Sequence, residues 1–394
     1  MNLAKEIHLK AELLVEGVNA TKDALDGIGL RYKEQNHGLF GWDFEDHAGE
    51  ALPDDFELPN GTIVQFRKNA ASPYTVERRN GSLVVTRNGQ ELSEARWLTR
   101  PAYYDRTTSD GTAMRRICQI GGADSFFLCY NNYCSHWKDN EQCLFCNLVS
   151  TSSTYRNVIG RKQLEQISQT IGAAFGEGCA EHVLMTGGCF PGEKETDIVV
   201  SIIEAMKVGL GKDRVPGCLL PSPPADLNDL RRIREAGITG IGYSMEIWDP
   251  SLFAAICPGK ARNPGRDHFL KTLLRAVNIF GPGNVFSVFV SGLEPMDSLV
   301  EGVTYLAEHG IASLPFVWSP VPGSKLHRHR APSADWFMEL NDRIVSIYAE
   351  CRLPDTGVHC HRCDGNSLVH DLVRLRTACL RESAVCVDIE PVSW

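Results

Sequence analysis

The sequence predicts an α/β protein, on three observations. From about Asp124 onward, short apolar runs alternate with longer amphipathic stretches, which is typical of parallel βα units. The part before it carries strand-like runs separated by Asn-Gly pairs, which indicate hairpins. A chain of 394 residues with 43% hydrophobic content can bury one barrel-sized core and still supply further segments.

Residues 1–110 are expected to form a mixed N-terminal segment. A helix is predicted over Leu3–Val18. Three strands are predicted next, over Thr62–Phe66, Tyr74–Glu77 and Ser82–Thr86. The Asn-Gly pairs at 80–81 and 88–89 predict tight turns, because both residue types tolerate positive φ. The segment is therefore predicted to be a helix followed by a small β-meander.

Residues 111–350 are expected to contain six strands, each followed by a helix. The strands are predicted over Ser125–Asn131, His182–Thr186, Cys218–Pro221, Ile238–Glu246, Val285–Ser291 and Ala312–Val317. The helices are predicted over Lys162–Phe175, Thr196–Val208, Ala225–Ala236, Asp267–Phe280, Met296–His309 and Ala334–Tyr348. This alternation suits a partial barrel or a doubly wound open sheet, and the pattern alone does not separate them. In both, functional side chains gather at the carboxyl ends of the strands.

Composition and charge indicate which classes of partner to expect. The net charge is −9, the isoelectric point is near 5.8, and no block of Lys and Arg stands out, so nucleic acid is not expected as a partner. The first ten residues mix charges into an apolar pattern, which predicts an amphipathic helix and not a signal peptide. No apolar run approaches the roughly 18 residues that a membrane-spanning helix needs. We therefore expect a soluble, cytoplasmic protein, whose 14 cysteines are mostly reduced.

Three of those cysteines lie on one predicted loop. Cys134, Cys143 and Cys146 follow the first strand of the central part with the spacing C-x8-C-x2-C. Thiolates are soft ligands that select iron–sulfur clusters, zinc or Cu(I). The loop can hold three corners of a metal site, and no fourth ligand is evident beside it.

This loop resembles that of the radical S-adenosylmethionine (SAM) enzymes. That family holds a [4Fe–4S] cluster with three cysteines, commonly spaced C-x3-C-x2-C with an aromatic residue just before the last. Phe145 fills the aromatic position, whereas the first gap has eight residues instead of three. The resemblance implies a partial (β/α)6 TIM-like barrel, a cluster on Cys134, Cys143 and Cys146, and SAM on the iron that no cysteine holds.

Further motifs resemble the SAM-binding elements of the family. Gly187 and Gly188 follow the second strand, where the family has a Gly-Gly-Glu motif whose backbone contacts the SAM amino group; the acidic residue is absent here. The fourth strand runs into Ser244 and Glu246. In the biotin-synthase and hydrogenase-maturation branch, an acidic residue there and a downstream arginine clamp the methionine end of SAM. The resemblance assigns the acidic role to Glu246.

The arginine of that clamp has two candidates. The resemblance assigns it to Arg266, with Arg262 as a rival. The turn Gly292-Leu-Glu294 and the run Pro320–Leu326 are similar to motifs of the same branch that border the adenine and the substrate. Four side chains are further candidates for the substrate cavity: Tyr130, Tyr243, Trp318 and His327.

The resemblance also implies an activity. The enzyme is expected to cleave SAM to a 5′-deoxyadenosyl radical that abstracts hydrogen from a small-molecule substrate in cofactor or natural-product biosynthesis. The electron is expected from an external donor of the flavodoxin or ferredoxin type. The reaction subclass (transferase, lyase or oxidoreductase) stays open at this point.

A second group of cysteines lies in residues 351–394, a C-terminal extension containing Cys and His. Cys351, Cys360 and Cys363 repeat the C-x8-C-x2-C spacing, and His359 and His361 flank the middle thiol. The group is a candidate for an auxiliary iron–sulfur cluster or a zinc ion. Unligated cysteines in a packed tail are the alternative.

Two other functions compete with the radical hypothesis. Cys143 and Cys146 could join Cys360 and Cys363 in one four-thiolate zinc site that staples the barrel, leaving a non-radical hydrolase or binding protein. Cys134 then has no explanation. A thiol-redox function for Cys143 and Cys146 is disfavoured because no thioredoxin-like βαβ unit surrounds them.

Overall fold

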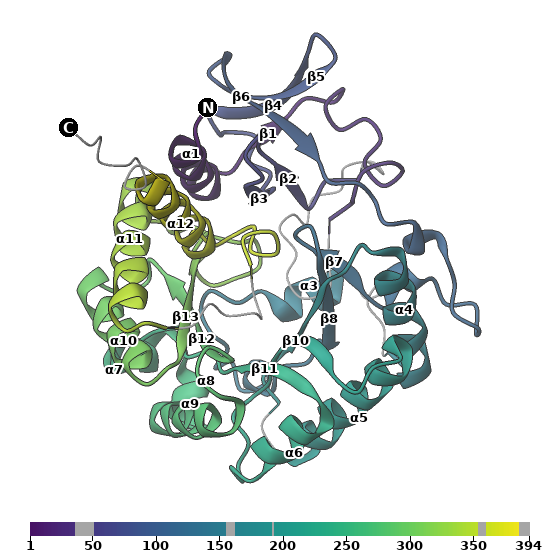
Figure 1. The fold of residues 1–394 in the computed structure, drawn as a ribbon, viewed down its shortest axis with the longest axis vertical. Helices are drawn as coiled ribbons and strands as arrows, with labels where there is room; N and C mark the ends of the chain where they lie inside the picture. Colours follow the sequence, from purple (N-terminus) through teal and green to yellow (C-terminus); the bar gives the residue numbers. More distant parts are fainter. Residues whose placement is uncertain (36–50, 155–161, 191–192, 354–359, 386–394) are drawn as a thin grey trace, which may run out of the picture.

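The computed structural model describes residues 1–35, 51–154, 162–190, 193–353 and 360–385. His359, one of the two flanking histidines considered above, lies outside these ranges. Within them the chain forms two sheets, a smaller N-terminal one and a larger curled one that is surrounded by helices (Figure 1).

The larger sheet has seven strands in the order β13-β12-β11-β10-β9-β8-β7. They are β7 (Gln119–Gly121), β8 (Ser125–Asn131), β9 (His182–Gly187), β10 (Val215–Leu220), β11 (Ile238–Gly242), β12 (Val285–Ser291) and β13 (Ala312–Val317). Strands β8 to β13 are parallel, and β7 pairs antiparallel with β8. All six predicted strands are present. The sequence missed β7 because three residues are too few for a periodic signal.

The helices of the central part lie outside the curled sheet (Figure 1). The longer ones are α4 (Leu164–Glu177), α5 (Glu193–Leu210), α6 (Asp229–Ala236), α9 (Arg266–Phe280), α10 (Met296–Glu308) and α11 (Ala334–Glu350). Shorter ones are η1 (Ala102–Asp105), η2 (Met114–Arg116), α2 (Ser135–Lys138), α3 (Leu148–Thr154), α7 (Pro250–Ile256) and α8 (Pro258–Arg262). A doubly wound sheet would carry helices on both faces. The predicted partial (β/α)6 barrel is therefore confirmed, and the open-sheet alternative is wrong.

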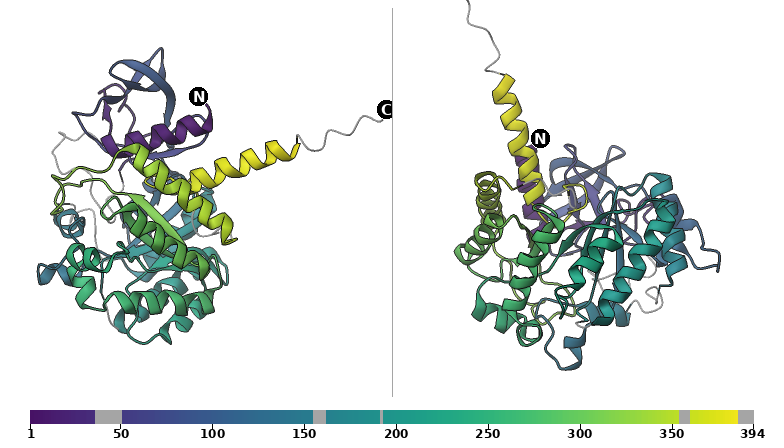
Figure 2. Two further views of the ribbon diagram at one scale, coloured as in Figure 1. Left: turned by 90° about the vertical axis from the view of Figure 1, so that its left-hand side faces the viewer. Right: turned by 60° about the horizontal axis from the view of Figure 1, so that its bottom comes forward.

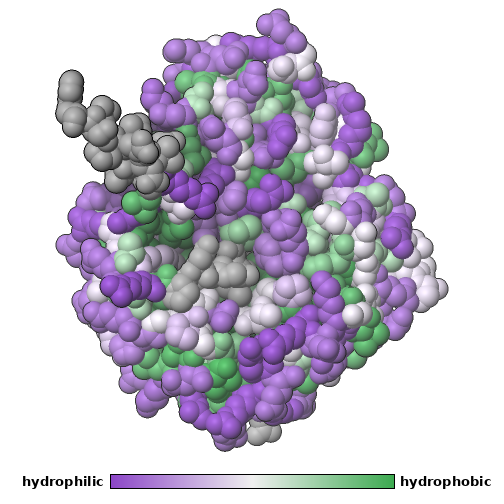
Figure 3. Space-filling model, in the orientation of Figure 1, coloured by the Kyte–Doolittle hydropathy of each residue, from purple (hydrophilic) through white to green (hydrophobic). Residues whose placement is uncertain are grey.

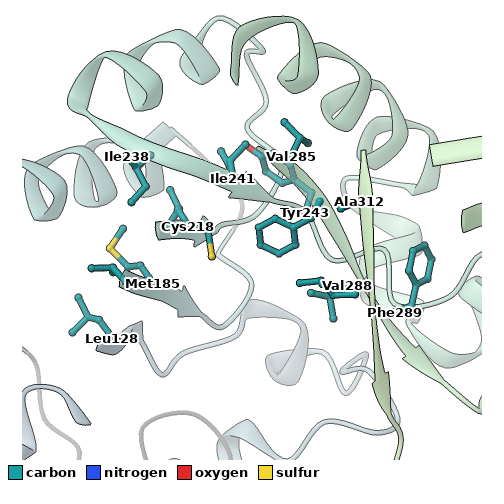
Figure 4. Packing of buried hydrophobic residues seen from close by; sticks show 14 of the residues in the cluster. Leu128, Met185, Cys218, Ile238, Ile241, Tyr243, Val285, Val288, Phe289 and Ala312 are labelled. Atoms are coloured by element: carbon teal, nitrogen blue, oxygen red, sulfur yellow. The ribbon is translucent and has the colours of Figure 1, made fainter. Parts of the chain in front are cut away.

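Side chains alternate along the barrel strands between the helix-facing core and the barrel interior. Leu128 of β8 and Met185 of β9 are opposite each other in register, and both are buried in the core that the helices cover (Figure 4). On β12, Val288 and Phe289 point to opposite sides of the strand (Figure 4). Each fully buried side chain of this size contributes about 1.5–3 kcal/mol, so the core fixes which residues face inward.

The N-terminal sheet has six strands in the order β1-β4-β5-β6-β2-β3. They are β1 (Asn19–Ala20), β2 (Asp55–Glu57), β3 (Ile63–Gln65), β4 (Tyr74–Arg79), β5 (Ser82–Arg87) and β6 (Gln90–Trp97). Asn80 and Asn88 have φ of 50° and 49°, as their hairpin turns require. The sequence missed β1, β2 and β6, since β1 and β2 are very short and β6 is mostly polar.

Helix α1 (Leu3–Glu16) fixes this sheet to the barrel by packing against α11, α12 (Val369–Val385) and β3. Its Lys10 is fully buried, with Nζ 2.8 Å from a carboxylate oxygen of Asp371 and 2.8 Å from the Asp364 carbonyl. Buried charges are stable only when paired in this way. Helix α12 continues outward from the body of the molecule (Figure 2).

Residues 360–367, which we call the C-terminal strap, connect the two edges of the half-open barrel. Arg362 accepts a hydrogen bond through its carbonyl from Ala123 N, at the β7–β8 turn (2.8 Å). At the other edge, Val317 N of β13 donates to the Asn366 carbonyl (2.9 Å). The strap therefore spans the opening between the first and last strands.

Hydrophilic residues predominate on the face shown in Figure 3, with apolar patches between them. Among the described residues, none of the helices combines the length and the apolar character that crossing a membrane requires.

Candidate functional site

The barrel interior contains a cavity of about 360 Å³, within the range of small-molecule sites. Its apolar wall comes from inward-facing strand residues, including Phe127 of β8, Leu184 of β9 and Val288 of β12. The strap contributes Asn366 to the same wall. The cavity therefore extends from the barrel strands to the segment that closes the barrel.

Cys134, Cys143 and Cys146 all line this cavity. Cys134 begins helix α2 three residues after β8 ends. Cys146 N donates to the Cys143 carbonyl (3.0 Å), a tight turn that keeps this thiol pair together. The loop thus brings three buried or half-buried thiols to the carboxyl end of the first parallel strand, where barrel chemistry is usually located.

The long first gap is a folded insertion and not a loose loop. It contains helix α2 and rests on helix α8, where Gly259 N donates to the Glu141 carbonyl (3.0 Å). A side chain at Gly259 would overlap the ring of His136. Arg262 forms ion pairs with Asp139 (3.2 Å) and Glu141 (2.5 Å) of the insertion. Arg262, the second candidate for the SAM carboxylate, is therefore engaged in holding residues 134–146, which we call the cluster loop after the cluster predicted there.

The three thiols differ in acidity. Burial raises the pKa of Cys134 and of Cys146. The pKa of Cys143 is lowered, chiefly by a hydrogen bond from Cys257 and against the effect of burial. Deprotonating all three in this cavity requires compensating positive charge.

Lys260 supplies a positive charge next to these thiols. Burial alone would lower its pKa, but Glu246, Cys143 and Cys257 raise it overall, so the ammonium stays charged. Its Nζ lies 2.7 Å from Glu246 Oε1 and 2.9 Å from the Ser244 carbonyl. Ser244, Glu246 and Lys260 all line the cavity. The sequence missed Lys260 because a single lysine at the start of a short helix carries no motif.

The structure does not bring Arg266 to the described cavity wall. Its Nε donates to the Trp248 carbonyl (3.0 Å), and its guanidinium stacks over the Trp248 ring at 4.6 Å. Among the described residues, Lys260 is the Lys or Arg that lines this wall.

Gly187 and Gly188 line the cavity beside the cluster loop. Gly188 N donates to the Asn131 carbonyl (2.8 Å), and a side chain at Gly188 would overlap the carbonyl of Tyr133. Packing against the cluster loop therefore already requires glycine at position 188. The contact of this turn with the SAM amino group stays a prediction.

Cys189 stands where the family has its acidic residue, and it also lines the cavity. Its Sγ is 3.2 Å from His136 Nε2 and 3.5 Å from Ser222 Oγ. Burial raises the pKa of Cys189 to about 12, so this thiol stays protonated near neutral pH.

Of the four side chains predicted for the substrate cavity, Trp318 is on its wall. Phe145, which was predicted from the cysteine motif, is on the same wall. Three are elsewhere: Tyr130 donates to Glu195 (2.8 Å), Tyr243 is buried in the core, and His327 Nδ1 faces the Ser324 carbonyl (3.1 Å).

The turn at Gly292–Glu294 and the run Pro320–Leu326, expected to border adenine and substrate, lie in different places relative to the cavity. Glu294 accepts hydrogen bonds from the backbone of Trp248 (2.8 Å) and Asp249 (2.9 Å), which fixes the loop after β11, and it does not line the cavity. The run Pro320–Leu326 lies against the cluster loop, since Leu326 N donates to the Leu144 carbonyl (3.2 Å).

The N-terminal sheet adds a polar end to the cavity, which sequence reasoning did not anticipate. Asp54, Asp55 and Gln65 line it together with the strap. Burial raises the pKa of Asp55 to about 7, against the opposing effect of Lys33, whose Nζ is 3.0 Å away. Residues 1–110 therefore contribute side chains to the site.

The second cysteine group does not assemble as its spacing suggested. Cys360 and Cys363 meet Asp124 and His182, with one donor atom of each residue within 4.8 Å of the others. Cys351 follows α11 near Glu308 and is not in this group, so the predicted set Cys351, Cys360 and Cys363 is wrong in its first member.

The alternative of one zinc ion on Cys143, Cys146, Cys360 and Cys363 is also wrong, because the two thiol pairs lie too far apart. Asp124 and His182 are at the amino ends of β8 and β9, whereas Cys143 and Cys146 follow the carboxyl end of β8. A strand of seven residues is about 20 Å long. The two thiol pairs therefore lie at opposite ends of the barrel wall and cannot share one ion.

Comparison with known proteins gives a relative in sequence. No protein-family model matches the chain. The bacteriochlorophyllide c C-7(1)-hydroxylase of Chlorobaculum limnaeum is 33% identical over 367 residues, which cover 87% of this chain and 85% of that protein.

Similar solved structures include methylornithine synthase (PylB), with a TM-score of 0.42 and 17% identity, covering 60% of this chain and 64% of that one. The hydrogenase maturase HydG from Carboxydothermus hydrogenoformans has a TM-score of 0.41 and 16% sequence identity, and the match covers 59% of this chain and 52% of that one. This chain spans less than two thirds of either solved chain. At these scores, function must be argued from the site and from the sequence relative.

Proposed function

The chain belongs to the radical SAM enzymes, and on this premise we propose that Cys134, Cys143 and Cys146 hold its [4Fe–4S] cluster. Enzymes of this family bind such a cluster and SAM, act on small molecules and take electrons from an external reductant. We propose a flavodoxin or ferredoxin as that reductant.

The observation that carries the residue assignment is the set of three thiols and one lysine on a single cavity wall. Soft thiolates suit iron, and the Lys260 ammonium offsets part of their negative charge. A further thiol on that wall, Cys189, follows β9 instead of the loop after β8, and its Sγ already faces His136 Nε2 at 3.2 Å. Three thiolates leave one iron of a cubane cluster without a cysteine, as SAM binding requires.

When bound, the cluster and SAM supply a carbon-centred radical that removes a hydrogen atom from the substrate. The protein orients the reactants and keeps water away. Lys260 would hold the SAM carboxylate through its charged ammonium, which Glu246 fixes in place at 2.7 Å. The apolar strand residues exclude water from the cavity, which protects a reactive radical from side reactions.

We propose an apolar ring compound of the tetrapyrrole class as the substrate, modified at a C–H bond. The relative is named for hydroxylating bacteriochlorophyllide c. Apolar walls from β8, β9 and β12 suit a ring system. Asp54, Asp55 and Gln65 at the polar end would bind its polar substituents.

Anaerobic reconstitution with iron and sulfide tests the proposal. The reconstituted protein should be brown and should bleach when dithionite reduces it. The reduced protein should convert SAM to 5′-deoxyadenosine, measured by mass spectrometry. Adding bacteriochlorophyllide should raise the 5′-deoxyadenosine yield, and deuterium at the substrate methyl groups should appear in the nucleoside. A colourless protein that leaves SAM intact would contradict the cluster assignment. A product yield that no tetrapyrrole changes would contradict the substrate class alone.

A further inference from the structure

Four metal-ligating side chains meet under the C-terminal strap, away from the cluster loop. Asp124 precedes β8, His182 begins β9, and Cys360 and Cys363 belong to the strap. One donor atom of each lies within 4.8 Å of the others. We propose that these four residues bind a single zinc ion.

The donor set and its size suit zinc. Zinc prefers four ligands in a tetrahedron of Cys sulfur, His nitrogen and carboxylate oxygen. Bond lengths of about 2.0–2.3 Å place neighbouring donors about 3.3–3.8 Å apart in such a tetrahedron. Sγ of Cys360 is already 3.8 Å from Asp124 Oδ2. The donors therefore need to approach one another by at most about 1.5 Å to complete the site.

The strap holds its two thiols in a metal-binding turn. Cys363 N donates to the Cys360 carbonyl (3.2 Å), and Asp364 N donates to the same oxygen (3.3 Å). Cys360 N donates to Cys363 Sγ (3.3 Å). A backbone N–H aimed at sulfur stabilises the thiolate form that a metal requires. The turn is thus organised around sulfur before any ion binds.

The charges balance when one zinc ion is added. Asp124 is buried and receives a hydrogen bond from Arg362 Nε (3.0 Å). His182 Nε2 is also shielded from solvent. Two thiolates and one carboxylate carry three negative charges, which a divalent ion and Arg362 neutralise. Arg362 then acts on the ion through Asp124, as outer partners of metal ligands do.

The ion would fasten the strap to the barrel. A side chain at Gly122 would overlap the Arg362 carbonyl, so the β7–β8 turn and the strap are in close backbone contact. The zinc ligands join the first two parallel strands to a segment that also bonds to β13. The site is structural, since three protein segments supply all four ligands of the tetrahedron.

Metal analysis of the full-length protein, purified without oxygen, tests this site directly. We expect one zinc ion per chain besides iron. The double variant Cys360→Ser with Cys363→Ser should lose the zinc and keep the iron. The matched control Cys351→Ser should keep both, because Cys351 has the same spacing but lies outside the group. A triple alanine variant of Cys134, Cys143 and Cys146 should lose iron and keep zinc.

A conservative variant keeps the test valid if the double variant does not fold. Asp124→Asn should weaken zinc binding by at least about tenfold, the smallest cost of perturbing a metal ligand shell, in competition with a chromophoric chelator. Cobalt in place of zinc should give a sulfur-to-metal charge-transfer band that this variant shifts.

Four results would overturn the proposal. The first is that wild-type protein contains no zinc even after growth with added zinc, and the second is that the double variant retains zinc. The third is that the triple variant retains iron bound by the strap. The fourth is that Cys360 and Cys363 form a disulfide in the anaerobic protein. None of them depends on whether the enzyme cleaves SAM, so this test is separate from that of the proposed function.

Discussion

Two segments of this protein share the spacing C-x8-C-x2-C, and the fold uses them differently. In the first, Cys134, Cys143 and Cys146 all reach the barrel cavity. In the second, Cys360 and Cys363 join Asp124 and His182, while Cys351 lies near Glu308. In both segments, the two cysteines of the C-x2-C turn reach the same site.

The difference arises from what surrounds each first cysteine. Cys134 begins α2, which packs on α8 and so turns the intervening residues back toward the cavity. Cys351 directly follows α11, a helix of 17 residues whose position is set by its packing on α1 and α10. Spacing can place two thiols on one short turn, but a third ligand eight residues away depends on tertiary contacts.

The largest effect should come from the first cysteine group. Alanine at Cys134, Cys143 or Cys146 should abolish the brown chromophore and reduce 5′-deoxyadenosine formation to background, because in the proposed cluster each thiolate would hold a separate iron. Alanine at Cys351 should leave both unchanged. Equal losses in Cys351→Ala would remove the distinction between the two groups.

A second test asks what makes the first group a SAM site. Lys260→Met should raise the KM for SAM about 10- to 100-fold, since a hydrogen bond to a charged group contributes about 1.5–3 kcal/mol. The KM values should be compared at equal iron content, because Lys260 also offsets thiolate charge. Lys271→Met, at an exposed position of α9, is the control. A lower Tm with an unchanged KM would mean that Lys260 serves only as the partner of Glu246.

A third test concerns packing beside the cluster loop. Gly188→Ala should destabilise the fold by about 1–3 kcal/mol, because the added methyl group overlaps the Tyr133 carbonyl. Iron occupancy should fall with it. Gly176→Ala is the matched control, because no atom lies within 4 Å of the position that its Cβ would take. In helix α4 this change should be neutral or stabilise by up to about 1 kcal/mol. Thermal melts of both variants would show whether the clash matters.

A fourth test, which leaves the wild-type fold intact, is a pH dependence behind the Gly-Gly turn. Burial raises the pKa of Glu195 to about 7, although Tyr130 (2.8 Å) and Ser222 N (3.1 Å) donate to its carboxyl group. Its contribution to stability is therefore present below pH 4.5 and is lost as the pH rises to about 7, by up to about 3 kcal/mol.

Glu195→Gln has no charge to bury and should remove this dependence. The difference in Tm between variant and wild type should grow from pH 5 to pH 8. A constant difference over that range would show that Glu195 is ionised throughout.

Local patterns were sufficient for the barrel strands and for the hairpin turns at Asn80 and Asn88. They also singled out the three thiols that the fold brings to one cavity. Hydrophobic alternation, turn chemistry and a C-x2-C pair act over a few residues, so a single stretch of sequence contains the whole signal. The same reasoning could not choose between a barrel and an open sheet, because curvature depends on how all strands and helices pack together.

The residues that complete each site are distant in sequence, and only the fold brings them together. Lys260 reaches the thiols through helix α8, and Asp55 reaches the cavity from the N-terminal sheet. Asp124 and His182 meet the strap although more than 170 residues separate them from it in the chain. Such contacts have no local signal, since they exist only once the strap has bridged the two edges of the barrel. Residue types and short spacings therefore set the chemistry that this chain can perform, and long-range packing set which residues perform it together.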